Sequence, residues 1–191
     1  MERIYVEEKT FDKIDFREKP LAKGHYENCY FNNCNLSNVD LSGIHFSECA
    51  FAGCNLSLAK LGGTKLNDIK FKDCKLLGLR FDHCDDFLFS VRFDDCILKL
   101  SSFYKRKLKK TIFRNINLQE ADFTEADVSG SVFDNCDLLR ATFVNAVLEK
   151  ADFRTAYNYA IDPEVNRMKK ARFSIAGVAG LLSKYDIVIE G

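Results

Sequence analysis

The sequence predicts an all-β solenoid, a chain wound into stacked coils, and two periodicities carry this prediction. The first is a five-residue spacing, since every fifth residue from Val6 to Phe81 is apolar. Asp86 breaks the series, and a shift of two residues restores it from Leu88 to Phe153. A five-residue step turns an α-helix by about 140° and alternates between the faces of a flat strand. The chain must therefore turn within every repeat.

The second periodicity is twenty residues long and appears in the choice between Phe and Leu. One column contains only Phe: Phe11, Phe31, Phe51, Phe71, Phe93, Phe113, Phe133 and Phe153. A neighbouring column contains only Leu: Leu36, Leu56, Leu76, Leu98, Leu118 and Leu138. Four repeats of five residues therefore form one coil, and like side chains stack between coils. We expect about seven to eight coils, which at ~4.8 Å per coil make a rod roughly 36 Å long.

A second inward position lies two residues before each Leu or Phe and is mostly small or β-branched. All eight cysteines occupy it: Cys29, Cys34, Cys49, Cys54, Cys74, Cys84, Cys96 and Cys136. No CxxC pair is present, so we interpret them as small core residues, neither zinc ligands nor a disulfide framework. Lys9, Lys19 and Gly24 depart from the pattern and predict an irregular first coil. Arg106 also departs, and indicates either a bulge or a buried guanidinium with partners.

Composition excludes several classes of function. Lys plus Arg and Asp plus Glu both total 28, which disfavours nucleic-acid binding through bulk positive charge. No apolar run is long enough for a membrane span, and the charged start lacks a signal-peptide core; we expect a cytoplasmic protein. GxSxG, P-loop, GxGxxG and HExxH motifs are absent, so neither an enzyme nor a cofactor is expected. His25 and His45 should lie roughly 5 Å apart on neighbouring coils, but a metal pair is disfavoured because no carboxylate or inward Cys shares their position.

The chain is predicted to have two parts. Residues 1–157 form the solenoid, with the register shift at about 82–88, and residues 158–191 form a short α-helical and strand module. Asp162 and Pro163 are typical of a helix start, so we expect a helix over 163–170. A second helical stretch is expected over 174–183 and a strand over 185–190. This module either caps the last coil only or also makes a dimer.

The repeat motif of a small residue, Asp or Asn, then Leu or Phe and two further residues occurs as ADFTE, ADVSG, CNLSN, VDLSG and CDLLR. It resembles the pentapeptide-repeat proteins over about residues 6–157. The resemblance implies a right-handed quadrilateral β-helix. The segments DPEVNR and LLSKYDIVIEG resemble the tail of the microcin-immunity and quinolone-resistance (Qnr) branch. That likeness implies a homodimer through Ile175, Val178, Leu181, Leu182, Tyr185, Ile187 and Ile189.

The same resemblance implies a function without catalysis. Proteins of that branch are rods that imitate duplex DNA, bind type II topoisomerases such as DNA gyrase, and protect them from quinolones or peptide toxins. Zero net charge allows such imitation only along selected stripes. The alternative is a general protein-interaction scaffold with a non-topoisomerase partner. Neither hypothesis includes a membrane or direct nucleic-acid binding.

The outward residues supply the candidate contacts. The predicted partner-binding acids are Glu27, Glu48, Asp68, Asp73, Asp82, Asp85, Asp86, Asp94, Asp95, Glu120, Asp122, Glu125 and Asp127. A possible apolar contact consists of Leu58, Leu77, Ile97, Leu100 and Leu139. The basic segment KRKLKK (105–110) is either a solvated cluster or a contact with a carboxylate-rich surface or with DNA.

Overall fold

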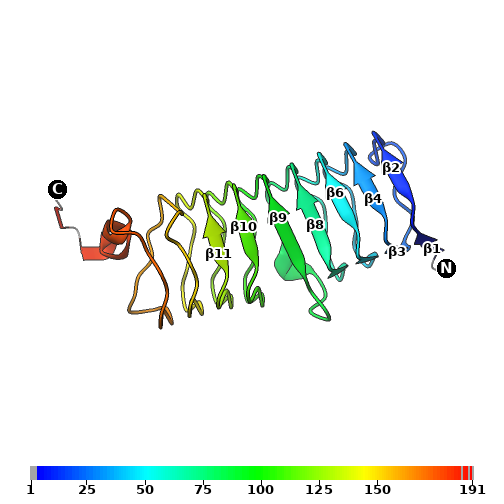
Figure 1. The fold of residues 1–191 in the computed structure, drawn as a ribbon. Coiled ribbons are helices and arrows are strands. Elements are labelled where there is room, and N and C mark those ends of the chain that lie inside the picture. The colour runs from blue at the N-terminus through cyan, green and yellow to red at the C-terminus, as the bar shows by residue number, and fades with distance from the viewer. Residues whose placement is uncertain (1–3, 186, 189, 191) are drawn as a thin grey trace.

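The computed structural model describes residues 4–185, 187–188 and 190. The chain is a parallel β-solenoid of about seven turns, as predicted, with its two ends at opposite ends of the rod (Figure 1). Its strands and 3-10 helices are β1 (Ile4–Glu7), β2 (Thr10–Asp12), β3 (Gly24–Glu27), β4 (Tyr30–Asn32), β5 (His45–Ser47), β6 (Ala50–Ala52), β7 (Lys65–Asn67), β8 (Ile69–Lys72), η1 (Phe81–His83), β9 (Val91–Asp94), β10 (Ile112–Arg114), β11 (Val132–Asp134), η2 (Val178–Leu181) and η3 (Ser183–Tyr185). No helix among the described residues is long and apolar enough to cross a membrane.

The coils present four sides, each joined to the next coil by parallel pairing. The Phe face is the sheet of order β11-β10-β9-β8-β6-β4-β2, in which Phe31 pairs with Phe51 and Phe51 with Phe71. The mixed face begins as the sheet β1-β3-β5-β7 and continues through bridges such as Lys107 to Asp127. Isolated bridges hold the other two sides. The Leu face contains Asn35–Asn55–Lys75, and the fourth face contains Arg80–Ser102–Asp122.

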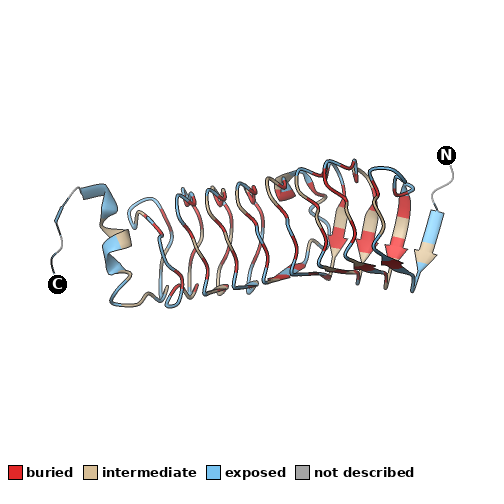
Figure 2. Cartoon of the chain, turned by 90° about the horizontal axis from the view of Figure 1, so that it is seen from above, coloured by how far each residue is buried: buried red, intermediate tan, exposed pale blue. Residues whose placement is uncertain are grey.

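The core runs along the axis of the rod, as the buried residues in Figure 2 show. On the Phe face the rings stack between coils, with centroids 4.5 Å apart at Phe31–Phe51 and 4.6 Å apart at Phe133–Phe153. A second stack on the fourth face contains Phe81, Phe103, Phe123 and Phe143. Rings of the two stacks meet edge to face, which is a favoured aromatic geometry. Each Phe ring therefore stacks on the rings of neighbouring coils in its own face and meets the rings of the other stack edge to face.

The register shift forms a seam in the mixed face. The loop of residues 85–90 is fixed at its start by the Asp85 N–H, which donates to the Thr64 carbonyl at 2.9 Å. It is fixed at its end by the Ser90 N–H, which donates to the Leu66 carbonyl at 2.9 Å. The prediction that Leu88 points inward is wrong, because Leu88 is 58% exposed and Phe89 packs against the core instead. Because the Ser90 N–H holds the end of the loop, the first side chain to pack against the core after the loop is Phe89, one residue later than predicted.

Arg106 closes this seam from inside. It is 3% exposed, and its guanidinium donates to the Cys84 carbonyl and to Asp86 while lying 4.8 Å from the Phe89 ring centroid. In a regular coil the equivalent carbonyl accepts a backbone N–H, as the Arg106 carbonyl does from Asp127 at 2.8 Å. Of the two interpretations of Arg106, the buried guanidinium is confirmed.

The end of the chain differs from the prediction. The expected helix over 163–170 is wrong, because these residues form turns and the coil continues through the bridges Val147–Arg167 and Asp152–Arg172. The buried Asn166 fixes this coil, since its amide donates to the Phe143 carbonyl and accepts from the Ala146 N–H. The ladder thus passes the expected boundary at residue 157.

The last segment is also less regular than expected. The stretch 174–183 holds η2 and the start of η3, not an α-helix, and Tyr185 ends η3. Gly177 lies against the Tyr159 hydroxyl and Gly180 against the Tyr159 backbone carbonyl, and an added Cβ would come within 2.0 Å and 2.2 Å of these two oxygens. No strand is present among the described residues of 185–190, and Ile189 lies outside the described residues.

Candidate partner-binding surfaces

The first acidic candidates lie together on the N-terminal half of the mixed face. Glu27 lies on β3, where it accepts a hydrogen bond from the Tyr5 hydroxyl that raises the pKa of Tyr5 to about 12. Glu48 and Asp68 occupy equivalent corner turns one coil apart, with φ of 54° and 48°. Within residues 4–185, Glu48 has no ion pair, while Asp68 lies 3.7 Å from Arg92. Glu27 and Glu48 are therefore candidates without a basic partner among the described residues, a property that they share with Asp73, Asp94 and Asp95 of the Phe face.

The acids around the seam already have structural partners. Asp82 forms an ion pair with Arg80 at 2.6 Å. Burial raises and the Arg80 guanidinium lowers the pKa of Asp82, and the net direction is downward. Asp85 accepts the Phe87 N–H at 2.8 Å, and Asp86 binds Arg106. These carboxylates stabilise the seam, and of the three the Asp82 side chain is nearly buried while the Asp86 side chain is 95% exposed.

Three candidate acids on the Phe face have different surroundings. Asp73 and Asp95 lie in left-handed turns with φ of 53° and 52°. Asp95 accepts a hydrogen bond from the Asn115 amide at 2.9 Å. Asp94 lies on β9 with one carboxylate oxygen buried and without a hydrogen bond. Asp73 and Asp95 follow Phe71 and Phe93, which pair on neighbouring coils of the Phe face, whereas Glu27 and Glu48 belong to the mixed face.

The acids of the C-terminal half are largely neutralised. Glu120 pairs with Lys99 at 3.2 Å, Glu125 with Lys105 at 3.5 Å and Asp127 with Lys109 at 3.2 Å. Asp122 accepts the Thr124 N–H and stabilises a turn. Sequence reasoning missed these pairs because the partners stand about one coil apart in sequence. Opposite charges at an offset near twenty residues are the signal that would have found them.

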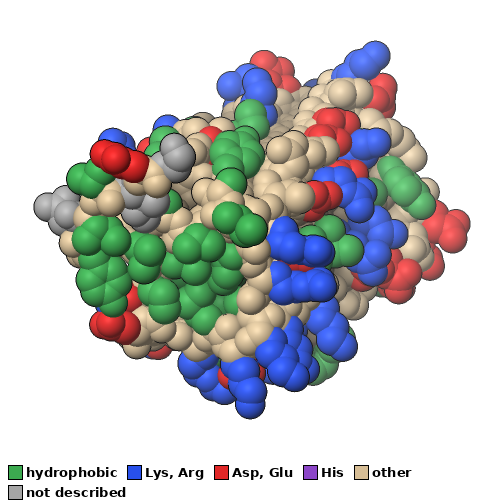
Figure 3. Space-filling model, turned by 60° about the vertical axis from the view of Figure 1, so that its left-hand side comes forward, with side chains coloured by type: hydrophobic (Ala, Val, Ile, Leu, Met, Phe, Trp, Pro, Cys, Tyr) green, Lys and Arg blue, Asp and Glu red, His purple; other side chains and the backbone are tan. Residues whose placement is uncertain are grey.

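Basic side chains without ion pairs gather on the C-terminal half of the mixed face. Arg106 points inward, whereas Lys107, Lys109 and Lys110 are exposed. Figure 3 shows Lys and Arg side chains side by side next to the C-terminal end. Within residues 4–185, no ion pair is found for the lysines of this set: Lys107, Lys110, Lys150, Lys169 and Lys170.

The apolar candidates lie where predicted, on the Leu face. Leu58 and Leu100 are 55% and 49% exposed and occupy left-handed turns. The Leu58 side chain lies over Gly78, where an added Cβ would come within 2.7 Å of it. Ile97 and Leu139 are also exposed, and Leu77 is half-buried.

The candidate dimer residues are at the free end of the rod. Ile175 is 95% exposed, and Val178, Tyr185 and Ile187 are exposed as well. Leu181 packs partly against the core and Leu182 is half-buried. Hydrophobic side chains form a patch at this end in Figure 3. The dimer itself stays a prediction.

The cysteines are buried free thiols, which confirms their assignment to the core. All of them except Cys84 contact backbone carbonyls, as where the Cys54 Sγ lies 3.2 Å from the Phe31 carbonyl of the preceding coil. Burial raises the pKa of Cys49, Cys84 and Cys136 to about 12. The His25 and His45 ring centroids are 4.2 Å apart, as expected for neighbouring coils. The described residues contain no group of three or more His, Cys, Asp or Glu that could hold a metal ion.

Comparison with known proteins gives one family and several solved structures of the same fold. A family model described as "Pentapeptide repeat region" matches residues 25–85 and 87–157. Two trypsin-treated variants of QnrB1, a plasmid-mediated fluoroquinolone resistance protein, match in structure. The first has 17% identity and a TM-score of 0.67, covering 98% of this chain and 92% of that one. The second has 18% identity and a TM-score of 0.58, covering 99% and 98%.

A further structural match has a different role. HetL, a pentapeptide-repeat protein involved in heterocyst differentiation regulation in the cyanobacterium Nostoc, matches with 14% identity and a TM-score of 0.50, covering 91% of this chain and 87% of that one. No curated protein matches the sequence. At these identities the structural likenesses show the fold alone.

Proposed function

Because this chain belongs to the pentapeptide-repeat family, we propose that it is a non-enzymatic cytoplasmic protein that binds a type II topoisomerase, DNA gyrase, and protects it from a quinolone or a peptide toxin. The observation that carries the proposal is the likeness to QnrB1 along nearly the whole of both chains. A rod of the same architecture as QnrB1 can contact the same kind of partner surface. QnrB1 is a fluoroquinolone resistance protein.

The acidic edge of the N-terminal half is the part of the rod suited to partial DNA mimicry. Glu27 and Glu48 have no basic partner within residues 4–185. Duplex DNA has about one charge per 1.7 Å, whereas one acid per coil gives about one charge per 4.8 Å. The edge therefore supplies about a third of the charge density of the duplex. The lysines without ion pairs on the C-terminal half of this face would repel a surface that binds DNA, which supports a contact through the N-terminal half.

A gyrase assay with two matched variants tests the proposal. Purified protein should change DNA supercoiling by gyrase, or its inhibition by a quinolone or a toxin. The triple variant Glu27→Lys, Glu48→Lys, Asp68→Lys should lose this effect. The control Glu120→Lys, Glu125→Lys, Asp127→Lys makes the same change of charge among acids that already have ion pairs, and should keep most of it. No effect of the unmodified protein would exclude gyrase as the partner.

The second candidate function is a scaffold for a different protein partner. The exposed Leu58 and Leu100 of the Leu face favour it, since they expose apolar surface that the fold does not require. HetL shows that this fold also serves a regulatory role. A protein without any effect on gyrase, but with a partner whose binding is lost in Leu58→Ser, Leu100→Ser, would support the scaffold.

The proposed homodimer is tested separately. The double variant Ile175→Asp, Val178→Asp changes two exposed residues and leaves the coil bridges through Arg172 intact. Light scattering should then report half the mass of the unmodified protein. A truncation before Pro163 is a poorer test, because it removes Asn166 and opens the last coil.

A further inference from the structure

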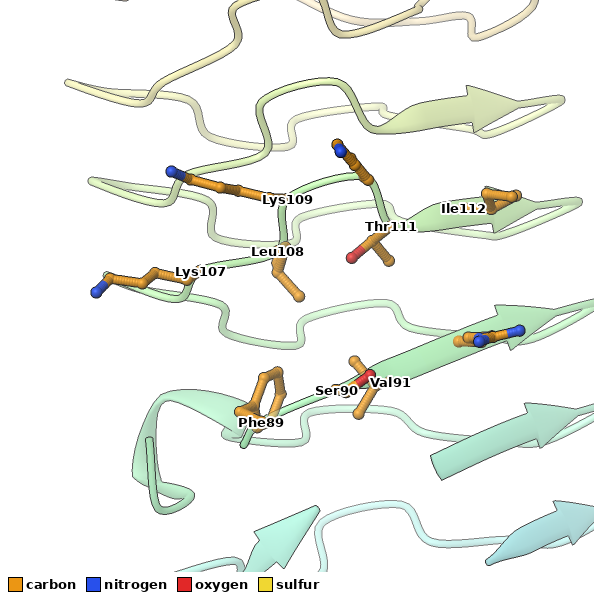
Figure 4. A pocket seen from close by; sticks show the side chains of 10 residues that line it. Phe89, Ser90, Val91, Lys107, Leu108, Lys109, Thr111 and Ile112 are labelled. Atoms are coloured by element: carbon orange, nitrogen blue, oxygen red, sulfur yellow. The ribbon is translucent and has the colours of Figure 1, made fainter. Parts of the chain in front are cut away.

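A cavity opens at the seam between the loop of residues 85–90 and the next coil. It has a volume of about 380 Å³, within the range of small-ligand pockets. Figure 4 shows Phe89, Ser90 and Val91 on one wall and Lys107, Leu108, Lys109 and Thr111 on the other, and Lys110 also lines the cavity. Of the described residues that line it, Arg92, Lys107, Lys109 and Lys110 are basic and none is acidic. This combination of concavity and charge occurs where the ladder of the mixed face is interrupted.

The interruption leaves hydrogen-bond donors without acceptors. The Cys84 carbonyl that the Lys107 N–H would reach in a regular coil is held by the Arg106 guanidinium. In the next coil the Ser129 N–H donates to the Asp127 side chain, but Lys107 offers no such acceptor to the Lys109 N–H. Among the described residues, neither N–H has an acceptor. The hydroxyl groups of Ser90 and Thr111 also lack a partner there.

The basic side chains around the cavity are only partly neutralised. Lys109 lies 3.2 Å from Asp127, and Arg92 lies 3.7 Å from Asp68. Lys107 and Lys110 have no ion pair within residues 4–185. Long cationic side chains on a rim can turn toward a bound anion, and hydrogen bonds to a charged group are about twice as strong as neutral ones. The cavity therefore favours a negatively charged occupant.

We propose that this seam cavity binds a phosphate-bearing ligand. A phosphate group presents at least three acceptor oxygens in a tetrahedral arrangement, whereas a carboxylate has two oxygens in one plane. Hydroxyl and N–H donors come here from both walls, and the Lys107 and Lys110 ammonium groups balance the charge. Of the apolar lining residues Phe89, Val91 and Leu108, the half-buried Phe89 has surface to contact the remainder of the ligand, since Val91 and Leu108 are buried in the core. This binding site does not depend on the proposed topoisomerase partner.

The test is a titration of the full isotope-labelled chain with inorganic phosphate and with pyrophosphate at constant ionic strength. The amide resonances of Lys107, Lys109 and Thr111 should shift and saturate. The variant Lys107→Gln, Lys110→Gln should weaken binding by roughly tenfold or more, the effect of losing one charged hydrogen bond. Thermal unfolding should confirm that this variant and the control variant remain folded.

The matched control is Lys150→Gln, Lys170→Gln, which removes the same charge from the same face outside the cavity. It should leave binding unchanged within about twofold. Equal weakening by both variants would assign the effect to general attraction and overturn the site. Acetate shifting the same resonances as strongly, or no saturable shift with either probe, would also overturn it.

Discussion

The two halves of the rod, before and after the seam, have the same backbone plan and opposite surfaces on the mixed face. Before the seam this face is a regular sheet, β1-β3-β5-β7, in which Glu27 and Glu48 have no ion pair within the described residues. After it the face is held by isolated bridges and presents Lys107 and Lys110. The inward residues determine the fold, whereas many outward positions accept either an acidic or a basic residue. One repeat can therefore have opposite charge in two halves without a change of architecture.

The two halves also differ in their core residues, and substitutions there should have the largest effect on the free energy of unfolding. On the fourth face Phe123 stacks between Phe103 and Phe143 after the seam, while the N-terminal half has Leu41. Phe123→Ala should lower the free energy of unfolding by about 4 kcal/mol and Leu41→Ala by about 3 kcal/mol. Denaturant unfolding followed by circular dichroism measures both. A greater loss for Leu41→Ala would contradict the view that the second Phe stack stabilises the C-terminal half.

The seam between the halves should depend on one side chain. Arg106→Ala removes the donor to the Cys84 carbonyl and leaves a cavity beside Phe89, and we expect a loss of about 3 kcal/mol. Lys107→Ala, its exposed neighbour, should change the free energy of unfolding by less than about 0.5 kcal/mol. Equal values for the two variants in denaturant unfolding would show that the guanidinium does not close the seam.

The buried thiols predict a loss of stability at alkaline pH in both halves. Unfolded cysteines ionise near pH 9, whereas burial raises the pKa of Cys49, Cys84 and Cys136 to about 12. These raised values contribute stability below pH 9 that is lost as the pH rises from 9 toward 12. Each thiol should contribute a slope of about 1.4 kcal/mol per pH unit. Cys49→Ala should flatten the profile measured by denaturant unfolding, and an unchanged slope would contradict it.

The smallest effect concerns the corner turns. The N-terminal coils place Asn28, Asn33 and Asn38 at left-handed positions, while coils next to the seam place Leu58 and Leu100 there. A non-glycine, non-Asn residue is strained at such φ values. Leu100→Gly should therefore raise the free energy of unfolding by about 0.5 kcal/mol. A clear loss of stability would show that the exposed Leu100 side chain packs more than its surface position indicates.

The repeat made the fold predictable because each coil repeats the same steric requirement. The seam was harder, since Leu88 and Phe89 are both apolar and only the hydrogen bonds at Asp85 and Ser90 decide between them. The end of the coil was mispredicted because Asp162 and Pro163 are typical of a helix start, while Asn166 satisfies the coil from within.

The sequence predicts which candidate residues point outward, but not which of them form ion pairs. Glu48 and Leu58 lie outward as the repeat requires. Whether an acid is free depends on a base one coil away, as in the pair Glu125–Lys105. The phosphate cavity could not be predicted, because it results from a backbone hydrogen bond that the Arg106 side chain replaces.

The buried Arg106 has a mechanical consequence. Coils touch only their neighbours, so a pull along the rod passes through every coil in series, and the weakest junction yields first. At the seam a side chain on rotatable bonds replaces part of a backbone ladder. Under tension the two halves of the rod should therefore separate first at the seam, where the contacts of Arg106 join them.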